Sequence, residues 1–121
     1  MKTDMEKKRI YISGPISGHD MEERKKEFSR VKAMLEGKGY EVFNPMENGL
    51  PQSSSTADHM RADIRALLEC DEIYMMRRWN HSAGCQTELL VALAVGLKVA
   101  FELKETVTAK DGRIVYNLTF E

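Results

Sequence analysis

The sequence contains little of what secreted, zinc-binding or membrane proteins need. Its 121 residues include only two cysteines, Cys70 and Cys85, and neither belongs to a CxxC motif or a Cys/His cluster. This argues against a disulfide scaffold and a zinc site, and it indicates a reducing, cytoplasmic location. The most apolar stretch, Leu89 to Leu97, is far shorter than the roughly 20 residues that cross a bilayer. We therefore expect no membrane association.

An excess of charge of one sign is also lacking. Lysine and arginine number 18 and aspartate and glutamate 19, for a net charge of -1. A protein that binds nucleic acid through its phosphates usually carries a basic field, so we expect no polymeric nucleic acid partner. The three histidines, at positions 19, 59 and 81, show no metal-ligand spacing. No dinucleotide or triphosphate fingerprint is present, so neither a metal nor another cofactor is expected.

What the sequence does contain is an alternation of strand and helix patterns. With 31 % charged and 42 % hydrophobic residues, residues 1–121 are expected to fold as one globular domain. Helices are expected within residues 21–40, 55–70 and 84–97, the last of them apolar on nearly every side and therefore well covered. Strands are expected at residues 9–13, 40–45, 71–76 and 98–103, with a fifth at 114–120 after an Asp-Gly hairpin turn.

This order predicts an α/β protein with a Rossmann-like (flavodoxin-like) fold. The expected sheet is open and mostly parallel, with about five strands, helices on both faces and an antiparallel C-terminal hairpin strand. Ligands of such sheets bind beyond the carboxyl ends of the strands, at the switch in strand order. The segments to search are therefore residues 14–20, 44–56 and 77–84, of which the polar second one is a candidate mobile flap.

Glu88 is the only formally charged residue between Arg78 and Lys98. It is either an acid favoured by the dipole near a helix N-terminus, or a pocket carboxylate with a raised pKa that serves as nucleophile or base. Asp63 borders the apolar stripe of its helix, and it is either a site residue or a boundary acid paired with His59 or an arginine. Both alternatives stay open at this point.

The segment "SGPISG", Ser13 to Gly18, follows the first strand and is too short for a phosphate-loop motif. Its glycines still allow a ligand to approach the backbone. Ser82, together with the backbone N–H groups of residues 83–85, could hold a single phosphate at a helix N-terminus. Tyr11 lies inside the first strand and is either a core aromatic or a site residue.

Three segments together resemble the nucleoside 2-deoxyribosyltransferase superfamily, particularly its small bacterial and phage-like members. They are "YISGPISG", "DIRALLECDEIY" and "SAGCQTELLVALAVGLKV". Asp63 lies eight residues before Asp71, and Ser82 lies six residues before Glu88. These spacings resemble the branch of 2'-deoxynucleoside 5'-monophosphate N-glycosidases more than the true transferases, whose aspartate before the nucleophile is missing from "RRWNHSAG".

The resemblance implies roles for individual residues. Glu88 would be the nucleophile, Asp63 would protonate or hold the departing base, and Tyr11 would be the active-site tyrosine. Ser82 would bind the 5'-phosphate beside Gly84. The sugar and phosphate would be lined by the segment after the first strand, namely Ser13, Gly14, Pro15, Ile16 and Gly18.

The expected function is therefore cleavage of the N-glycosidic bond of 2'-deoxynucleoside 5'-monophosphates or deoxynucleosides, by hydrolysis or by transfer. Two alternatives remain. One is a non-catalytic module that binds or senses nucleotides on the same fold, because a fold does not determine a function. The other is cleavage of another N-glycoside, such as NAD. The resemblance also implies a homodimer or larger homo-oligomer, with the terminal hairpin, residues 98–121, as a candidate interface.

Overall fold

The computed structural model of the protein describes residues 7–110 and 113–120. Three helices and four short strands alternate through its first hundred residues. The strands are β1 (Arg9–Ser13), β2 (Glu41–Phe43), β3 (Glu72–Met75) and β4 (Lys98–Phe101). The helices are α1 (Met21–Gly37), α2 (Thr56–Leu68) and α3 (Ala83–Ala94), with single 3-10 turns at η1 (Pro45–Glu47) and η2 (Trp79–His81).

The four strands form one parallel sheet in the order β2-β1-β3-β4. Tyr11 in β1 lies opposite Phe43 in β2 and Ile73 in β3, so the two central strands are paired on both sides. From β1 the chain moves to one side of the sheet and later returns to the other. This is the switch in strand order at which ligands of such sheets bind.

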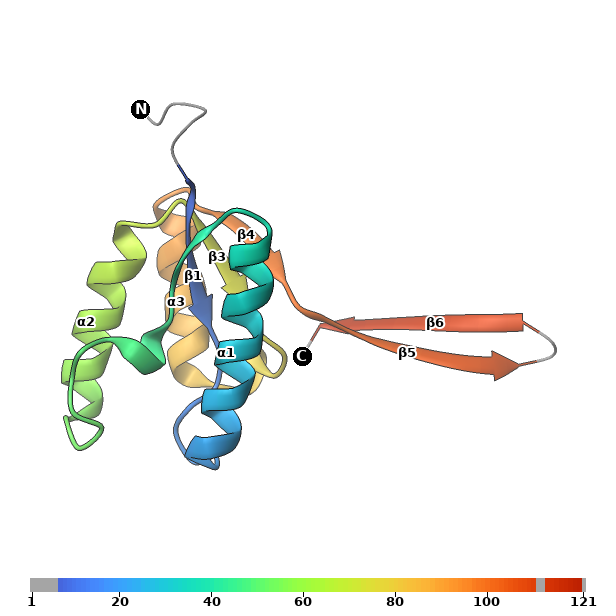
Figure 1. The fold of residues 1–121 in the computed structure, drawn as a ribbon, viewed down its shortest axis with the longest axis horizontal. Coiled ribbons are helices and arrows are strands. Elements are labelled where there is room, and N and C mark those ends of the chain that lie inside the picture. The colour runs from blue at the N-terminus through green and yellow to red at the C-terminus, as the bar shows by residue number, and fades with distance from the viewer. Residues whose placement is uncertain (1–6, 111–112, 121) are drawn as a thin grey trace.

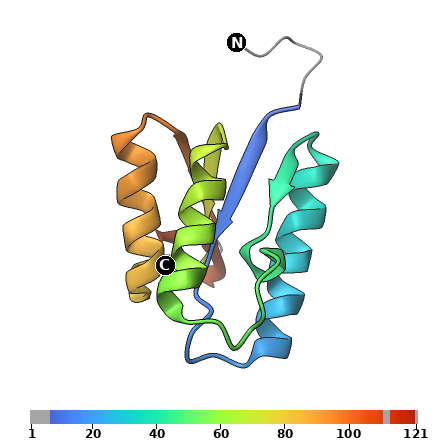
Figure 2. The same cartoon turned by 90° about the vertical axis from the view of Figure 1, so that its left-hand side faces the viewer.

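Helices cover both faces of the sheet (Figures 1 and 2). One face packs against α1 through Phe28, Val31 and Leu35, which share a core with alternate residues of β1 and β3. The opposite face packs against α2 and α3, and its core contains Tyr11, Ile73, Leu67, Cys85 and Ala92. Both central strands are therefore buried, as expected for a parallel sheet.

The C-terminal strands lie outside this sheet. The expected fourth strand is interrupted at Glu102, and β5 (Leu103–Lys110) and β6 (Arg113–Phe120) pair antiparallel as a separate two-stranded sheet. Figure 1 shows this hairpin projecting away from the α/β body. The parallel sheet thus has four strands and not about five. The expected Asp-Gly turn lies outside the described residues.

The ends of the helices follow from local chemistry. Ser55 caps α2 by accepting a hydrogen bond from the Asp58 N–H, and Ser82 caps α3 in the same way. Helix α3 ends at Ala94, three residues earlier than expected, and Gly96 follows in a left-handed conformation with φ of 78°. In the part of the chain that the structure describes, no helix could span a membrane.

The expectation that α3 is covered on all sides does not hold. Its inner side carries the buried residues Cys85, Glu88 and Ala92. Its outer side is open, because the side chains of Leu90 and Leu93 are 67 % and 58 % exposed.

Candidate active site

The carboxylate of Glu88 is buried between α3 and the end of β1. The residue is 6 % exposed, and both of its oxygens accept hydrogen bonds from β1. The Tyr11 hydroxyl donates to Oε2 at 2.5 Å, and the Ser13 hydroxyl donates to Oε1 at 2.8 Å. Tyr11 and Ser13 point to the same face of the sheet because they are two residues apart in a strand. Two donors on one strand thus orient one carboxylate on a helix.

The surroundings of Glu88 favour its protonated form. Burial raises its pKa to about 7, and the charge of Asp63 acts in the same direction, against the hydrogen bonds from Tyr11 and Ser13. Glu88 is thus a buried carboxylate with a raised pKa, and its role as nucleophile or base stays a prediction. The group is close to the balance between acid and base at neutral pH, which is where acid–base and nucleophilic groups are most useful.

Tyr11 is a neutral hydrogen-bond donor inside the core. Burial, followed by the charges of Glu88 and Asp63, raises the pKa of its phenol well above the usual value. Its ring stacks on Phe43 at a centroid distance of 5.5 Å. The two interpretations of Tyr11 therefore merge, because it is both a core aromatic and a direct partner of Glu88.

Asp63 reaches the same region from α2. It is 9 % exposed, and its Oδ1 accepts a hydrogen bond from the Asn48 side chain at 3.0 Å. Burial raises its pKa, whereas the hydrogen bond from Asn48 and the neighbouring His59 lower it. Because the charge of Asp63 also raises the pKa values of Glu88 and Tyr11, the three groups are electrostatic neighbours.

The loop after β1 is used largely for packing. A Cβ atom on Gly14 would lie 2.7 Å from the Met76 sulfur, so glycine is required there by the core itself. Pro15 is buried, and Ile16 packs against the core on the α1 side of the sheet. Gly18 is exposed and has a φ of 80°. Ser13, in contrast, donates a hydrogen bond to Glu88.

The first turn of α3 lies beside this carboxylate. Ser82 Oγ accepts a hydrogen bond from the Cys85 N–H at 3.2 Å, so this hydroxyl already serves as a helix cap. The Cys85 thiol is buried, which raises its pKa, while hydrogen bonds with Ser13 and Ser82 lower it. A Cβ atom on Gly84 would lie 3.4 Å from Met60 Cε on α2, which is an ordinary van der Waals distance.

Arg24 is a site residue that the sequence analysis missed. It is 9 % exposed, and its Nε donates to the Pro15 carbonyl at 2.7 Å while its guanidinium lies 5.4 Å from the centre of the Phe28 ring. Its charge lowers the pKa of Cys85, which places it near the first turn of α3. The signal was present in the sequence, because Arg24, Phe28, Val31 and Leu35 follow one face of α1.

Asn48 is a second residue that the sequence analysis missed, and its side chain donates a hydrogen bond to Asp63.

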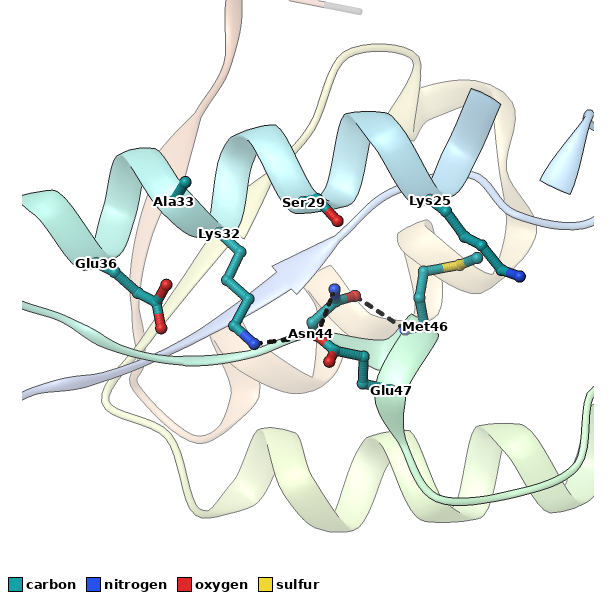
Figure 3. A pocket seen from close by; sticks show the side chains of 8 residues that line it. All are labelled: Lys25, Ser29, Lys32, Ala33, Glu36, Asn44, Met46 and Glu47. Carbon is teal, nitrogen blue, oxygen red and sulfur yellow. Dashed lines mark hydrogen bonds and ion pairs between the residues drawn. The ribbon is translucent and has the colours of Figure 1, made fainter. Parts of the chain in front are cut away.

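A cavity of about 420 Å³ lies elsewhere, between α1 and η1 (Figure 3). Its lining consists of Lys25, Ser29, Lys32, Ala33, Glu36, Asn44, Met46 and Glu47. Lys32 Nζ and the Asn44 amide both contact Glu47 Oε1, at 3.1 and 3.0 Å. None of the predicted site residues lines this cavity, so it is separate from the Glu88 site.

The fold and the site define an α/β protein of Rossmann-like type, with a buried carboxylate at the carboxyl end of a central parallel strand. Residues 8–101 match the model of the family described as Domain of unknown function (DUF4406). The chain therefore belongs to this family. No curated protein sequence matches the chain.

Two solved structures resemble the protein. A 2-desoxiribosyltransferase from Leishmania mexicana is 24 % identical, with a TM-score of 0.62 over 78 % of this chain and 63 % of its own. The CMP N-glycosidase BcmB from Clostridium botulinum is 26 % identical, with a TM-score of 0.56 over 78 % of this chain and 67 % of its own. The resemblance to the nucleoside 2-deoxyribosyltransferase superfamily, predicted from the sequence, is thus confirmed.

Proposed function

We propose that the protein cleaves the N-glycosidic bond of a 2'-deoxynucleoside 5'-monophosphate, with Glu88 as the nucleophile. The observation that carries this proposal is the Glu88 carboxylate, which is buried and held on both oxygens by Tyr11 and Ser13. Fixing a nucleophile in this way removes much of the entropic cost of attack. The similarity to a 2-desoxiribosyltransferase and to a CMP N-glycosidase supports this type of reaction.

The proposed reaction follows the two-carboxyl logic of retaining glycosidases. Ionised Glu88 attacks the anomeric carbon of the sugar, and the C–N bond breaks with its electron pair moving to the base. Asp63, whose pKa is raised by burial, supplies the proton that the departing base needs. Water then hydrolyses the glycosyl ester and regenerates Glu88. A 2-deoxy sugar favours this route, because it lacks the electron-withdrawing hydroxyl next to the reacting carbon.

A phosphate on the substrate fits the charges around α3. The helix N-terminus carries a partial positive charge, and the buried guanidinium of Arg24, which is also paired with Glu23 at 3.3 Å, lies nearby. Ser82 and the backbone N–H groups of the first turn, Gly84 included, are the proposed phosphate ligands. The segment "RRWNHSAG" brings no acid that would repel the phosphate. These features favour nucleotides over nucleosides.

Base release from a panel of substrates tests the proposal. The panel contains the four common deoxynucleoside monophosphates, the matching nucleosides and NAD, and free base is measured by chromatography. We expect release from a monophosphate, and a loss of at least about a thousandfold in Glu88→Ala, as for the loss of other nucleophiles. Thr87→Ala, at the exposed neighbouring position of α3, is the matched control and should keep its activity.

Three outcomes contradict the proposal. Base release that continues unchanged in Glu88→Ala rules out the nucleophile. Tight nucleotide binding in a calorimeter without any base release favours the binding module instead. Release of nicotinamide from NAD alone would move the activity to another N-glycoside.

A further inference from the structure

The side chain of Asn48 makes three hydrogen-bonding contacts within the protein. Its Oδ1 accepts from the Leu50 N–H at 3.0 Å. Its Nδ2 donates to Asp63 Oδ1 at 3.0 Å and lies 3.1 Å from His59 Nδ1. Asn48 lies in the polar segment between η1 and α2, whereas Asp63 and His59 lie one turn apart on α2. One amide thus connects this segment to the helix that carries Asp63.

The Leu50 contact fixes which way the amide points. A backbone N–H can only donate, so the atom that faces it must be the Asn48 oxygen, and the amino group must face α2. An amino group can only donate as well. Asp63 Oδ1 and His59 Nδ1 are therefore both acceptors. In the neutral form of His59, this contact requires the tautomer that carries its proton on Nε2.

The hydrogen bond from Asn48 also gives the two carboxylate oxygens of Asp63 different roles. Because Asn48 engages Oδ1, the other oxygen, Oδ2, is the one that can meet a departing base. The titratable groups around Asp63 are His59 on its own helix, Tyr11 on β1 and Glu88 on α3. Among these neighbours Asn48 is the uncharged donor, so it can hold Asp63 without neutralising it.

We infer that Asn48 is a positioning residue, which orients the Asp63 carboxylate through Oδ1. Its catalytic consequence rests on the proposed function, but its structural consequence does not. Without the Asn48 donor the ionised form of Asp63 loses a hydrogen bond, and protons bind to it more readily. The contact also ties the segment after η1 to the helix that carries Asp63.

Titration followed by NMR tests the inference without any substrate. In protein with ¹³C-labelled aspartate, the Asp63 midpoint should move to higher pH in Asn48→Leu, which removes the donor at similar volume. It should move further in Asn48→Asp, which places a second carboxylate there. Gln52→Leu, at an exposed position of the same segment, is the matched control and should leave the Asp63 midpoint in place. An unchanged midpoint in both Asn48 variants, with native amide spectra, overturns the inference.

The wild-type protein provides a second readout that needs no variant. The ¹⁵N shifts of the neutral His59 ring should show an unprotonated Nδ1. A proton on Nδ1 of the neutral ring would face the Asn48 amino group, so it overturns the inference even if the Asn48 variants fail to fold.

Activity then separates this inference from the proposed function. If a nucleotide substrate is found, Asn48→Leu should lower kcat about tenfold and move the Asp63 limb of the pH profile upward, with KM little changed. If no substrate is found but the NMR midpoint moves, the proposed function fails and the positioning role stands. If kcat falls while the pH profile stays in place, Asn48 has a purely structural role.

Discussion

The two carboxylates of the site are held by different kinds of structure. Glu88 projects from a helix and is bound by Tyr11 and Ser13, which belong to the central strand of the sheet. Asp63 also projects from a helix, but its donor is Asn48, which lies in an irregular segment. One carboxylate is held by regular elements on both sides, and the other depends on an irregular segment between η1 and α2.

This difference bears on how such a site can change. Groups on strands and helices are placed more accurately than groups on loops, and loops tolerate more variation. A nucleophile needs accurate placement against one carbon atom, whereas a proton donor must adapt to leaving bases of different shape. We therefore expect the Glu88 environment to govern the reaction itself and the Asn48 segment to govern which base is accepted.

The largest effect that separates the two regions concerns stability at high pH. The pKa of Glu88 is raised by burial from an ordinary 4.5 to about 7, so between these values the folded protein binds more protons than the unfolded chain. Stability must then fall as the pH rises through this window, by about 3 kcal/mol in total. Glu88→Gln removes this dependence, and it should be more stable than the wild-type protein at pH 8 by a similar amount.

Urea unfolding at pH 5 and at pH 8 measures this effect. Asp63→Asn is the matched comparison on the other side of the site, and it should remove a smaller pH dependence of the same sign, because its pKa is also raised. If the free energy of unfolding depends on pH equally in the wild-type protein and in Glu88→Gln, then ionisation of Glu88 does not destabilise the fold, and this prediction is wrong.

A smaller effect, a change in the pKa of Glu88, is expected when either of the two hydrogen-bond donors on β1 is removed. Tyr11→Phe keeps the ring that stacks on Phe43 and removes the hydroxyl that binds Glu88. A hydrogen bond to a carboxylate contributes about 1.5 to 3 kcal/mol, so the pKa of Glu88 should rise and ionised Glu88 should become more costly. Ser13→Ala should act in the same direction by a smaller amount, because the Tyr11 bond lowers this pKa more.

The acid limb of a pH profile of kcat/KM reports this pKa in the free enzyme. It should move to higher pH in both variants, further in Tyr11→Phe. The Asp63 midpoint, followed by NMR, should stay close to its wild-type position, since Asn48 remains in place. A limb that moves to lower pH in either variant contradicts the assignment of Glu88 as the group that must be ionised.

The sequence predicts the Glu88 region better than the Asp63 region, for physical reasons. The strand Arg9–Ser13 was predicted with its observed bounds, because its β-branched and aromatic residues end at a glycine and a proline. Its alternation already places Tyr11 and Ser13 on one face, although the contact of Ser13 with Glu88 requires the packing of α3. Asn48 lies in a segment without periodicity, so no pattern could indicate which way its amide points.

Other departures from the sequence prediction have the same origin. The exposed outer side of α3 contradicts the expected covering, because an apolar pattern reports what a helix can bury and not what is available to cover it. The parallel sheet ends at β4, and Glu102 separates β4 from β5. There the Glu102 side chain accepts hydrogen bonds from Arg30 and from the Arg77 N–H, contacts that join residues far apart in the sequence.

The smallest effect that we expect is on local opening of the Asn48 segment, and it tests whether backbone strain beside Asn48 weakens the contact with Asp63. Gly49 has a φ of 85°, next to the amide that binds Asp63, and a Cβ atom there would meet open space. Gly49→Ala should therefore cost only the strain of a left-handed alanine, about 1 kcal/mol. Gly39, which has a φ of 94° and lies just after α1, offers the same strain far from the site.

Gly49→Ala and Gly39→Ala should lose a similar free energy of unfolding. Only Gly49→Ala should speed hydrogen exchange at the Leu50 amide, which donates to Asn48, and move the Asp63 titration. Equal exchange in the two variants would mean that strain at position 49 does not loosen the contact between the Leu50 N–H and Asn48.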